Sequence, residues 1–202
     1  TSQTGFHFYE PFVGGGALML HLGEPEHLNF VPGPRLHIND MNPDLVLAYL
    51  AVQNQVEDLM EHLDELGQDL SKDAYLRIRA EVPNDKIERA ARFIYLNKTS
   101  FNGLWRVNSK GLYNVPWGQL RSPTLYVRDT LVSISQRLYG AEITYLDYRE
   151  SLTKVMSWDL NCKFIGSLRE VTFLRILQST QLFLNTWLRQ VQSRRCLKVT
   201  RE

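Results

Sequence analysis

Two features near the start of the chain could bind a ligand that contains a nucleoside. Three consecutive glycines, Gly14, Gly15 and Gly16, follow an aromatic segment and precede a helix-like apolar pattern, and Asp40 lies further along. A glycine turn at a helix N-terminus lets a ligand lie against bare backbone, and an acid at the end of the next strand can accept hydrogen bonds from ribose hydroxyls. The pattern predicts a cofactor site, and a tight turn without a ligand is the alternative.

The residues around the glycines favour one class of cofactor. Dinucleotide sites use Gly-x-Gly-x-x-Gly, whose spacing accommodates a pyrophosphate, whereas here the three adjacent glycines follow Glu10, Pro11, Phe12 and Val13. S-adenosylmethionine carries a ribose but no phosphate, so a shorter glycine turn suffices for it. The pattern therefore favours S-adenosylmethionine and disfavours the alternative of a nicotinamide-dependent oxidoreductase.

A second region carries charge of one sign. No acidic residue lies between Glu88 and Asp129. The basic residues of this stretch are Arg89, Arg92, Lys98, Arg106, Lys110, Arg121 and Arg128. A basic stretch rich in aromatic residues is typical of a surface that binds a polyanion, and a solvated face without function is the alternative. The net charge of the whole chain, +1, indicates no particular partner.

The elements that must position the glycines and the acid can be predicted from the apolar patterns. Residues 6–10 and 35–40 are predicted as strands, and residues 17–22 as a helix that follows the glycine turn. A strand, a glycine turn, a helix and a second strand that ends in an acid are typical of the start of a doubly wound α/β domain.

One long helix is predicted to follow the second strand. Asn42 and Pro43 are typical of the N-cap and the first position of a helix. Apolar residues then recur on one helical face as far as Leu66, and Gly67 is expected to end the helix.

The middle of the chain differs in kind. Ser71 and Asn84 are predicted to cap helices over residues 72–82 and 85–99. Residues 101–118 are predicted to form a β-hairpin with its turn at 108–111.

A further strand over residues 141–147 is predicted to end in an acid. We therefore expect residues 55–130 to be an insertion in an α/β domain formed by residues 1–54 and 131–202.

Four segments carry a family resemblance: "YEPFVGGGALMLHL", "INDMNPDLVLAY", "AARFIYLNKTSFNGLWRVNSKGLYNVPWG" and "ITYLDYRESL". In order and spacing, from about residue 8 to about residue 156, they resemble the bacterial and phage DNA adenine-N6 methyltransferases, the GATC-methylating D12 class. The resemblance implies a Rossmann-like methyltransferase sheet with an inserted helical and β-hairpin DNA-recognition domain. It also implies methyl transfer from S-adenosylmethionine to adenine N6 in double-stranded DNA, with GATC as the expected site.

The resemblance also implies roles for particular residues. The residues expected to hold S-adenosylmethionine are Glu10, Pro11, Phe12, Val13, Gly14, Gly15, Gly16, Asp40, Asp147 and Tyr148. Within this set, Asp40 is expected to accept the ribose hydroxyls, and Asp147 and Tyr148 to lie near the adenine. The alternative for Asp147 is a simple helix cap.

The expected DNA contacts lie in the insertion. Arg106 matches the family's guanine-recognition position, with Asn102 and Leu104 beside it. Phe101 is expected to contact the DNA backbone or to stack near the opened base pair. Lys98, Lys110 and Arg121 are expected to contact phosphates, which sets the position on the duplex rather than the sequence preference.

Two motifs of the family are missing. The family's chemistry depends on Asp-Pro-Pro-Tyr, and no two prolines are adjacent in this sequence. No catalytic residue is therefore assigned, although a divergent loop at 159–162 is an alternative. The family's opening Lys-Trp-Ala-Gly-Gly-Lys segment also has no match, and the tail, 158–202, is atypical, as after a frameshift or recombination. We expect little or no turnover, and a non-catalytic DNA-binding remnant is the alternative function.

The remaining features exclude several classes of protein. The composition, 44% hydrophobic and 22% charged, is typical of a globular protein. No apolar run approaches the roughly 18 residues that a membrane span needs. Cys162 and Cys196 lack the spacing of metal ligands. We expect a cytoplasmic monomer with no metal and no membrane contact.

Overall fold

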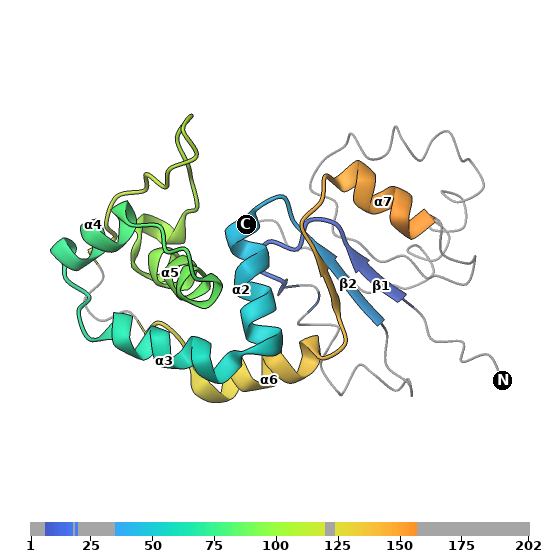
Figure 1. Ribbon diagram of the computed structural model, residues 1–202, viewed down its shortest axis with the longest axis horizontal. Coiled ribbons are helices and arrows are strands. Elements are labelled where there is room, and N and C mark those ends of the chain that lie inside the picture. The colour runs from blue at the N-terminus through green and yellow to red at the C-terminus, as the bar shows by residue number, and fades with distance from the viewer. Residues whose placement is uncertain (1–6, 18, 20–34, 120–123, 157–202) are drawn as a thin grey trace, which may run out of the picture. The chain divides into compact units, whose positions relative to one another are not determined.

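The computed structural model describes residues 7–17, 19, 35–119 and 124–156 (Figure 1). In this part of the chain a parallel sheet has the order β1 (His7–Glu10), β2 (Arg35–Asn39) and β3 (Glu142–Thr144). Tyr9 lies opposite His37, and His37 lies opposite Glu142. The α/β class is thus confirmed, and strands form within 6–10 and 35–40 as predicted. The third strand is shorter than the predicted 141–147, because it ends at Thr144, three residues before Asp147.

Parallel pairing brings the carboxyl ends of the three strands to one edge of the sheet, which is where ligands bind in open α/β sheets. Phe8 and Ile38 are buried in the core. The chain turns at the glycines after β1 and is helical at Ala17 and Met19; the rest of the helix predicted over 17–22 lies outside the described residues.

The single long helix predicted after β2 is wrong, because the structure has two helices there, α2 (Pro43–Asn54) and α3 (Val56–Gly67). Gln55, at φ −145° and ψ 48°, leaves the helical conformation between them. The Gln53 side chain donates to the carbonyls of Leu138 and Ala141 at 2.7 and 2.8 Å, which fixes the last turn of α2 beside β3. Both helices contact α5, so the apolar pattern continues across the break.

The start of α2 forms as predicted. The Asn42 side chain accepts hydrogen bonds from the backbone N–H groups of Asp44 and Leu45, and Pro43 is the first helical residue. The caps of the next two helices, α4 (Lys72–Ala80) and α5 (Lys86–Thr99), differ in outcome.

Ser71 caps α4, as predicted, and accepts from Ala74 N at 3.2 Å. The predicted cap of α5, Asn84, is wrong by one residue. Asp85 is the N-cap, and its Oδ1 accepts from Ile87 N and Glu88 N at 2.8 and 3.0 Å.

The hairpin predicted over residues 101–118 follows the expected path without two regular strands. A short 3₁₀ turn, η1 (Phe101–Gly103), interrupts the first arm. Isolated antiparallel bridges join Ser100 to Trp117 and Val107 to Tyr113. The predicted turn is present, because Gly111 N donates to the carbonyl of Asn108 at 2.9 Å and Gly111 has a φ of 75°.

Two further helices complete the described part of the chain. The first, α6 (Arg128–Leu138), contacts α2 and spans the predicted domain boundary at residue 130. The second, α7 (Tyr148–Met156), follows β3. No helix among the described residues is long and apolar enough to cross a membrane.

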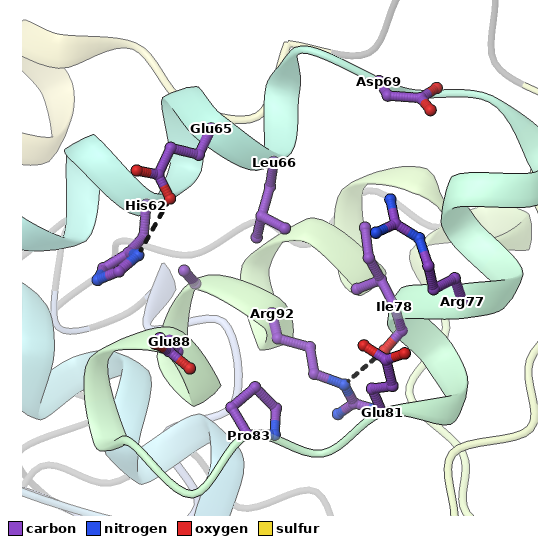
Figure 2. A pocket seen from close by; sticks show the side chains of 11 residues that line it. His62, Glu65, Leu66, Asp69, Arg77, Ile78, Glu81, Pro83, Glu88 and Arg92 are labelled. Carbon is purple, nitrogen blue, oxygen red and sulfur yellow. Dashed lines mark hydrogen bonds and ion pairs between the residues drawn. The ribbon is translucent and has the colours of Figure 1, made fainter.

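Residues of α3, α4 and α5 and of the loops between them line an open pocket of about 350 Å³ (Figure 2). On its wall, the buried Arg92 of α5 donates to the carbonyls of Ile78 and Arg79 at 2.8 and 2.7 Å, so it caps the carboxyl end of α4. His62 and Glu65 form an ion pair at the rim. None of the predicted site residues lines this pocket.

Candidate functional site

The carboxyl ends of the three strands are joined by one fully buried side chain, Asn39. Its Nδ2 donates to the carbonyls of Pro11 and Leu146 at 3.1 and 3.0 Å. Its Oδ1 accepts from Leu146 N at 3.0 Å and from the Thr144 hydroxyl at 2.8 Å. The segments that follow β1 and β3 are therefore held in fixed positions relative to the end of β2.

Asp40, the next residue, holds the glycine turn. Its Oδ2 accepts from Gly14 N at 3.1 Å, and its Oδ1 accepts from Asn42 N at 2.9 Å. The Tyr49 hydroxyl of α2 donates to the Gly14 carbonyl at 2.9 Å. Because each carboxylate oxygen has a second lone pair, Asp40 can still accept hydrogen bonds from a ligand.

The glycines differ in what a side chain would meet. At Gly16, with a φ of 68°, a Cβ would lie 2.5 Å from the Tyr49 hydroxyl and 3.1 Å from the Met19 side chain. At Gly14 and Gly15 a Cβ would meet nothing within 4 Å. Gly16 is therefore required by packing, whereas Gly14 and Gly15 leave bare backbone beside open space.

A buried acid lies at the base of the turn. Glu10 is 3% exposed, and among the described residues its Oε2 has no hydrogen-bond partner. Burial raises the pKa of Glu10 to about 7, although a hydrogen bond from the Met19 backbone opposes this rise. Burial and the negative charges of Glu10 and Asp40 raise the pKa of Tyr49, so its hydroxyl stays a donor. A buried carboxyl with one unpartnered oxygen beside a turn is suited to a cationic ligand group.

Two aromatic residues of the predicted set lie together. The rings of Phe12 and Tyr148 have centroids 5.6 Å apart, and Phe12 is 44% exposed. The Arg149 guanidinium lies 5.0 Å from the centre of the Tyr148 ring. The Asp147 carboxyl accepts from Arg149 N at 2.9 Å. This bond is what a helix cap makes, the alternative stated for Asp147.

The predicted DNA contacts that the structure describes all lie near the carboxyl end of α5 and on the hairpin. They are Lys98, Phe101, Asn102, Leu104, Arg106 and Lys110, and each is exposed. Phe101 and Leu104 are each 50% exposed. Arg121 lies outside the described residues.

Comparison with known proteins gives the family. The model of the D12 class N6 adenine-specific DNA methyltransferases matches residues 1–159. The chain belongs to this family. The resemblance found in the sequence motifs is thus confirmed.

Curated relatives are consistent with membership of the D12 class. The chain is 35% identical to a Type II methyltransferase of Methanocaldococcus jannaschii, over 70% of this chain and 51% of that protein. It is 34% identical to a Type II methyltransferase of Lactococcus lactis, over 76% and 54%. It is 28% identical to a DNA adenine methylase of Vibrio cholerae, over 73% and 51%. The chain spans about half the length of these relatives.

The sequence motifs of the D12 class predicted the turn and the acid but missed the residues that hold them. Asn39 lies inside the strand predicted over 35–40, and its only signal is that it is a polar residue at the end of a buried run. Tyr49 lies on the apolar face of the predicted helix, and nothing in its spacing indicates the bond to Gly14. Nothing in the sequence singled out Asn114, which bonds to Arg106 in the hairpin.

Some predictions for this D12-class chain concern the C-terminal tail. The loop at 159–162, the atypical segment 158–202 and the expected place of the missing Asp-Pro-Pro-Tyr all lie outside the described residues. Among the residues that the structure describes, no group of three or more His, Cys, Asp or Glu side chains could hold a metal ion.

Proposed function

We propose that this chain binds S-adenosylmethionine at the carboxyl edge of β1 and β2, and double-stranded DNA through the hairpin. The observation that carries the proposal is the bond between Asp40 and Gly14, which sets an acid beside a turn of bare backbone. Membership of the D12 class supports the same reaction, methyl transfer to adenine N6.

The residues of the turn fit this cofactor. Asp40 would accept the ribose hydroxyls, and the backbone of Gly14 and Gly15 would let the nucleoside approach closely. The unpartnered Oε2 of Glu10 would complement positive charge, which S-adenosylmethionine carries on its sulfonium and ammonium groups. Phe12 is exposed enough to contact an adenine ring. When bound, the cofactor would supply an electrophilic methyl group.

The remaining cofactor assignments have less support. Tyr148 packs beside Phe12 and would extend the same aromatic contact to the adenine. Asp147 is proposed to lie near the adenine while it caps α7. Pro11 and Val13 would act only through the backbone, because the Pro11 carbonyl and the Val13 N–H both bond to Asn39.

The helices and hairpin between residues 55 and 130 are proposed as the DNA-recognition insertion of an α/β domain made of residues 1–54 and 131–202. Arg106 would donate to O6 and N7 of a guanine, with Asn102 and Leu104 beside it. Phe101, half exposed, would stack near the flipped adenine. Lys98, Lys110 and Arg121 would contact phosphates, and GATC is the proposed site.

The missing Asp-Pro-Pro-Tyr favours a second candidate function. In the family this motif accepts hydrogen bonds from the target amino group, and no adjacent prolines occur here. We therefore propose that this chain alone binds cofactor and DNA with little or no turnover, as a non-catalytic remnant would.

Calorimetry with S-adenosylmethionine tests the cofactor site. Binding is expected for the unsubstituted chain and for a Glu65→Gln control on the exposed face of α3. It is expected to weaken at least about 10-fold in Asp40→Ala, because two hydrogen bonds to ribose are lost. NAD should give no heat. Folded protein that binds NAD, or that gives no heat with S-adenosylmethionine, contradicts the proposal.

A transfer assay tests turnover. The full chain is incubated with tritium-labelled S-adenosylmethionine and a duplex that contains GATC. Incorporation at the level of a no-enzyme blank is expected, and clear incorporation would show that the chain is active without the motif.

A further inference from the structure

The hairpin holds Arg106 by a pair of side-chain bonds that the sequence did not predict. Arg106 Nε donates to Asn114 Oδ1 at 2.8 Å, and Arg106 Nη2 donates to the Asn114 carbonyl at 3.3 Å. The two backbones are joined as well, because Asn114 N donates to the Arg106 carbonyl at 3.1 Å. Both side chains therefore lie on the same face of the hairpin. An exposed arginine would otherwise sample many rotamers.

The bonds to Asn114 occupy one edge of the guanidinium. They use the Nε–H and one of the two Nη2–H groups, while arginine has five N–H donors in a planar fork. The donors that remain include one on Nη1 and one on Nη2 that point in parallel from the end of the group. Such a pair matches the O6 and N7 acceptors of guanine in the major groove.

The position of Asn114 is itself fixed by the core of the insertion. Its neighbour Val115 is fully buried, and the Val115 carbonyl accepts from Tyr75 at 2.8 Å and from Arg79 at 3.1 Å, both on α4. The preceding neighbour of Asn114 is Tyr113, whose ring centroid lies 4.6 Å from that of Trp105.

Along the hairpin, successive side chains alternate between the two faces. The centroid of the Trp105 ring also lies 4.4 Å from that of Phe93 of α5, so Trp105 faces inward. Because side chains alternate along an extended segment, Arg106 and Asn114 face outward. The hairpin thus presents the end of the Arg106 guanidinium to the surrounding solution.

We propose that Asn114 is a positioning residue that orients Arg106 for end-on recognition of a guanine in double-stranded DNA. The inference rests on the proposed function and adds to it the residue on which the guanine preference depends. Asn114 acts through Arg106 and need not contact the DNA itself.

The test measures a preference ratio by fluorescence anisotropy with the full chain. One duplex contains a single GATC site, and the other replaces its guanines by 7-deazaguanine, which lacks the N7 acceptor. The preference ratio is the dissociation constant for the 7-deazaguanine duplex divided by that for the guanine duplex. It reports the bidentate contact and is expected to be about 5 or more. In Asn114→Ala the ratio is expected to fall close to 1.

Two variants separate positioning from a role in folding. Asn114→Asp keeps a side-chain acceptor for Arg106, so it should keep the ratio even where its charge weakens binding to both duplexes. In Arg106→Ala the ratio should be close to 1, and adding Asn114→Ala should change neither affinity further. A residue that only maintained the hairpin fold would weaken both duplexes in that background too.

The other possible results contradict either the role of Asn114 or the proposed function. An unchanged ratio in Asn114→Ala, or a ratio in Asn114→Asp as low as in Asn114→Ala, would overturn the inference while leaving guanine recognition by Arg106 intact. No binding, or no preference by the unsubstituted chain, would contradict the proposed function and remove the inference with it.

Discussion

Gly15 and Gly16 are neighbours in the turn, but the structure requires glycine at only one of them for packing. Gly16 has a left-handed backbone and faces the Tyr49 hydroxyl, while Gly15 has open space around it. The sequence predicted that glycine is needed in the turn because a ligand approaches it. The sequence alone could not show which glycine is needed for packing instead. The difference between the two glycines depends on Tyr49, which contacts the turn only when α2 is in place.

We expect Gly16→Ala to lower the free energy of unfolding by about 1–3 kcal/mol, because its Cβ clashes and its φ is strained. Chemical denaturation measures the change. Gly15→Ala is the matched control, expected within about 0.5 kcal/mol of the unsubstituted chain, with weaker binding of S-adenosylmethionine. Equal stabilities of the two variants would contradict this account of the turn.

Glu10 is expected to make stability depend on pH. Its pKa is about 7 in the folded chain, against an ordinary value of 4.5 for a glutamate side chain. Between these values the folded chain holds a proton that the unfolded chain releases, so the stabilisation is complete below pH 4.5 and lost as pH rises through 7.

Glu10→Gln isolates this effect, because glutamine does not titrate. The stability of the unsubstituted chain relative to Glu10→Gln should fall by about 3 kcal/mol between pH 4.5 and pH 7, as measured by urea denaturation at a series of pH values. A constant difference across this range would show that burial does not perturb Glu10.

At the scale of elements, the strands and most helices were predictable from local signals, and the joints between elements were not. Asn42 and Pro43 mark the start of α2 in any context. The break at Gln55 is stabilised by contacts of Gln53 with Leu138 and Ala141, far along the chain. Asn84 and Asp85 are both good caps, so local preference could not choose between them.

The choice of cap can be tested with a pair of substitutions. Asp85→Ala should lower the melting temperature by about 2–4 °C, since two backbone N–H groups of α5 lose their acceptor. Asn84→Ala should leave it within about 1 °C. Thermal unfolding followed by circular dichroism measures both, and the reverse order would place the start of α5 at Asn84.

At the scale of the whole described chain, α2 connects the glycine turn to the helices that carry the hairpin. Tyr49 bonds to Gly14 at one side of α2, and Asp44 pairs with Arg89 of α5 at the other. The sequence predicted helical structure over both segments, as one long helix after β2 and as a capped helix over 85–99. It did not predict that they pack against each other, because that contact joins segments far apart in sequence. The elements that carry the proposed cofactor contacts and those that carry the proposed DNA contacts are therefore both packed against α2.

DNA binding is expected to separate into two components. Lys110→Ala should weaken binding to all duplexes alike and reduce the slope of log K against log salt by about 1, because the phosphate contact proposed for Lys110 is lost. Arg106→Ala should instead remove about 1–3 kcal/mol of preference for the guanine-containing site. Titrations at several salt concentrations measure both, and a Lys110→Ala variant with an unchanged slope would exclude it from the phosphate contacts.

The buried amide of Asn39 has a consequence for how such a protein can change over evolutionary time. The bonds that shape the proposed cofactor site join residues that all precede the tail, namely Pro11, Gly14, Asn39, Asp40 and Leu146. A gene whose later codons were rewritten would therefore still encode every residue that makes these bonds. Under the proposed function, binding and chemistry would then be separately heritable, and a descendant could bind DNA without methylating it.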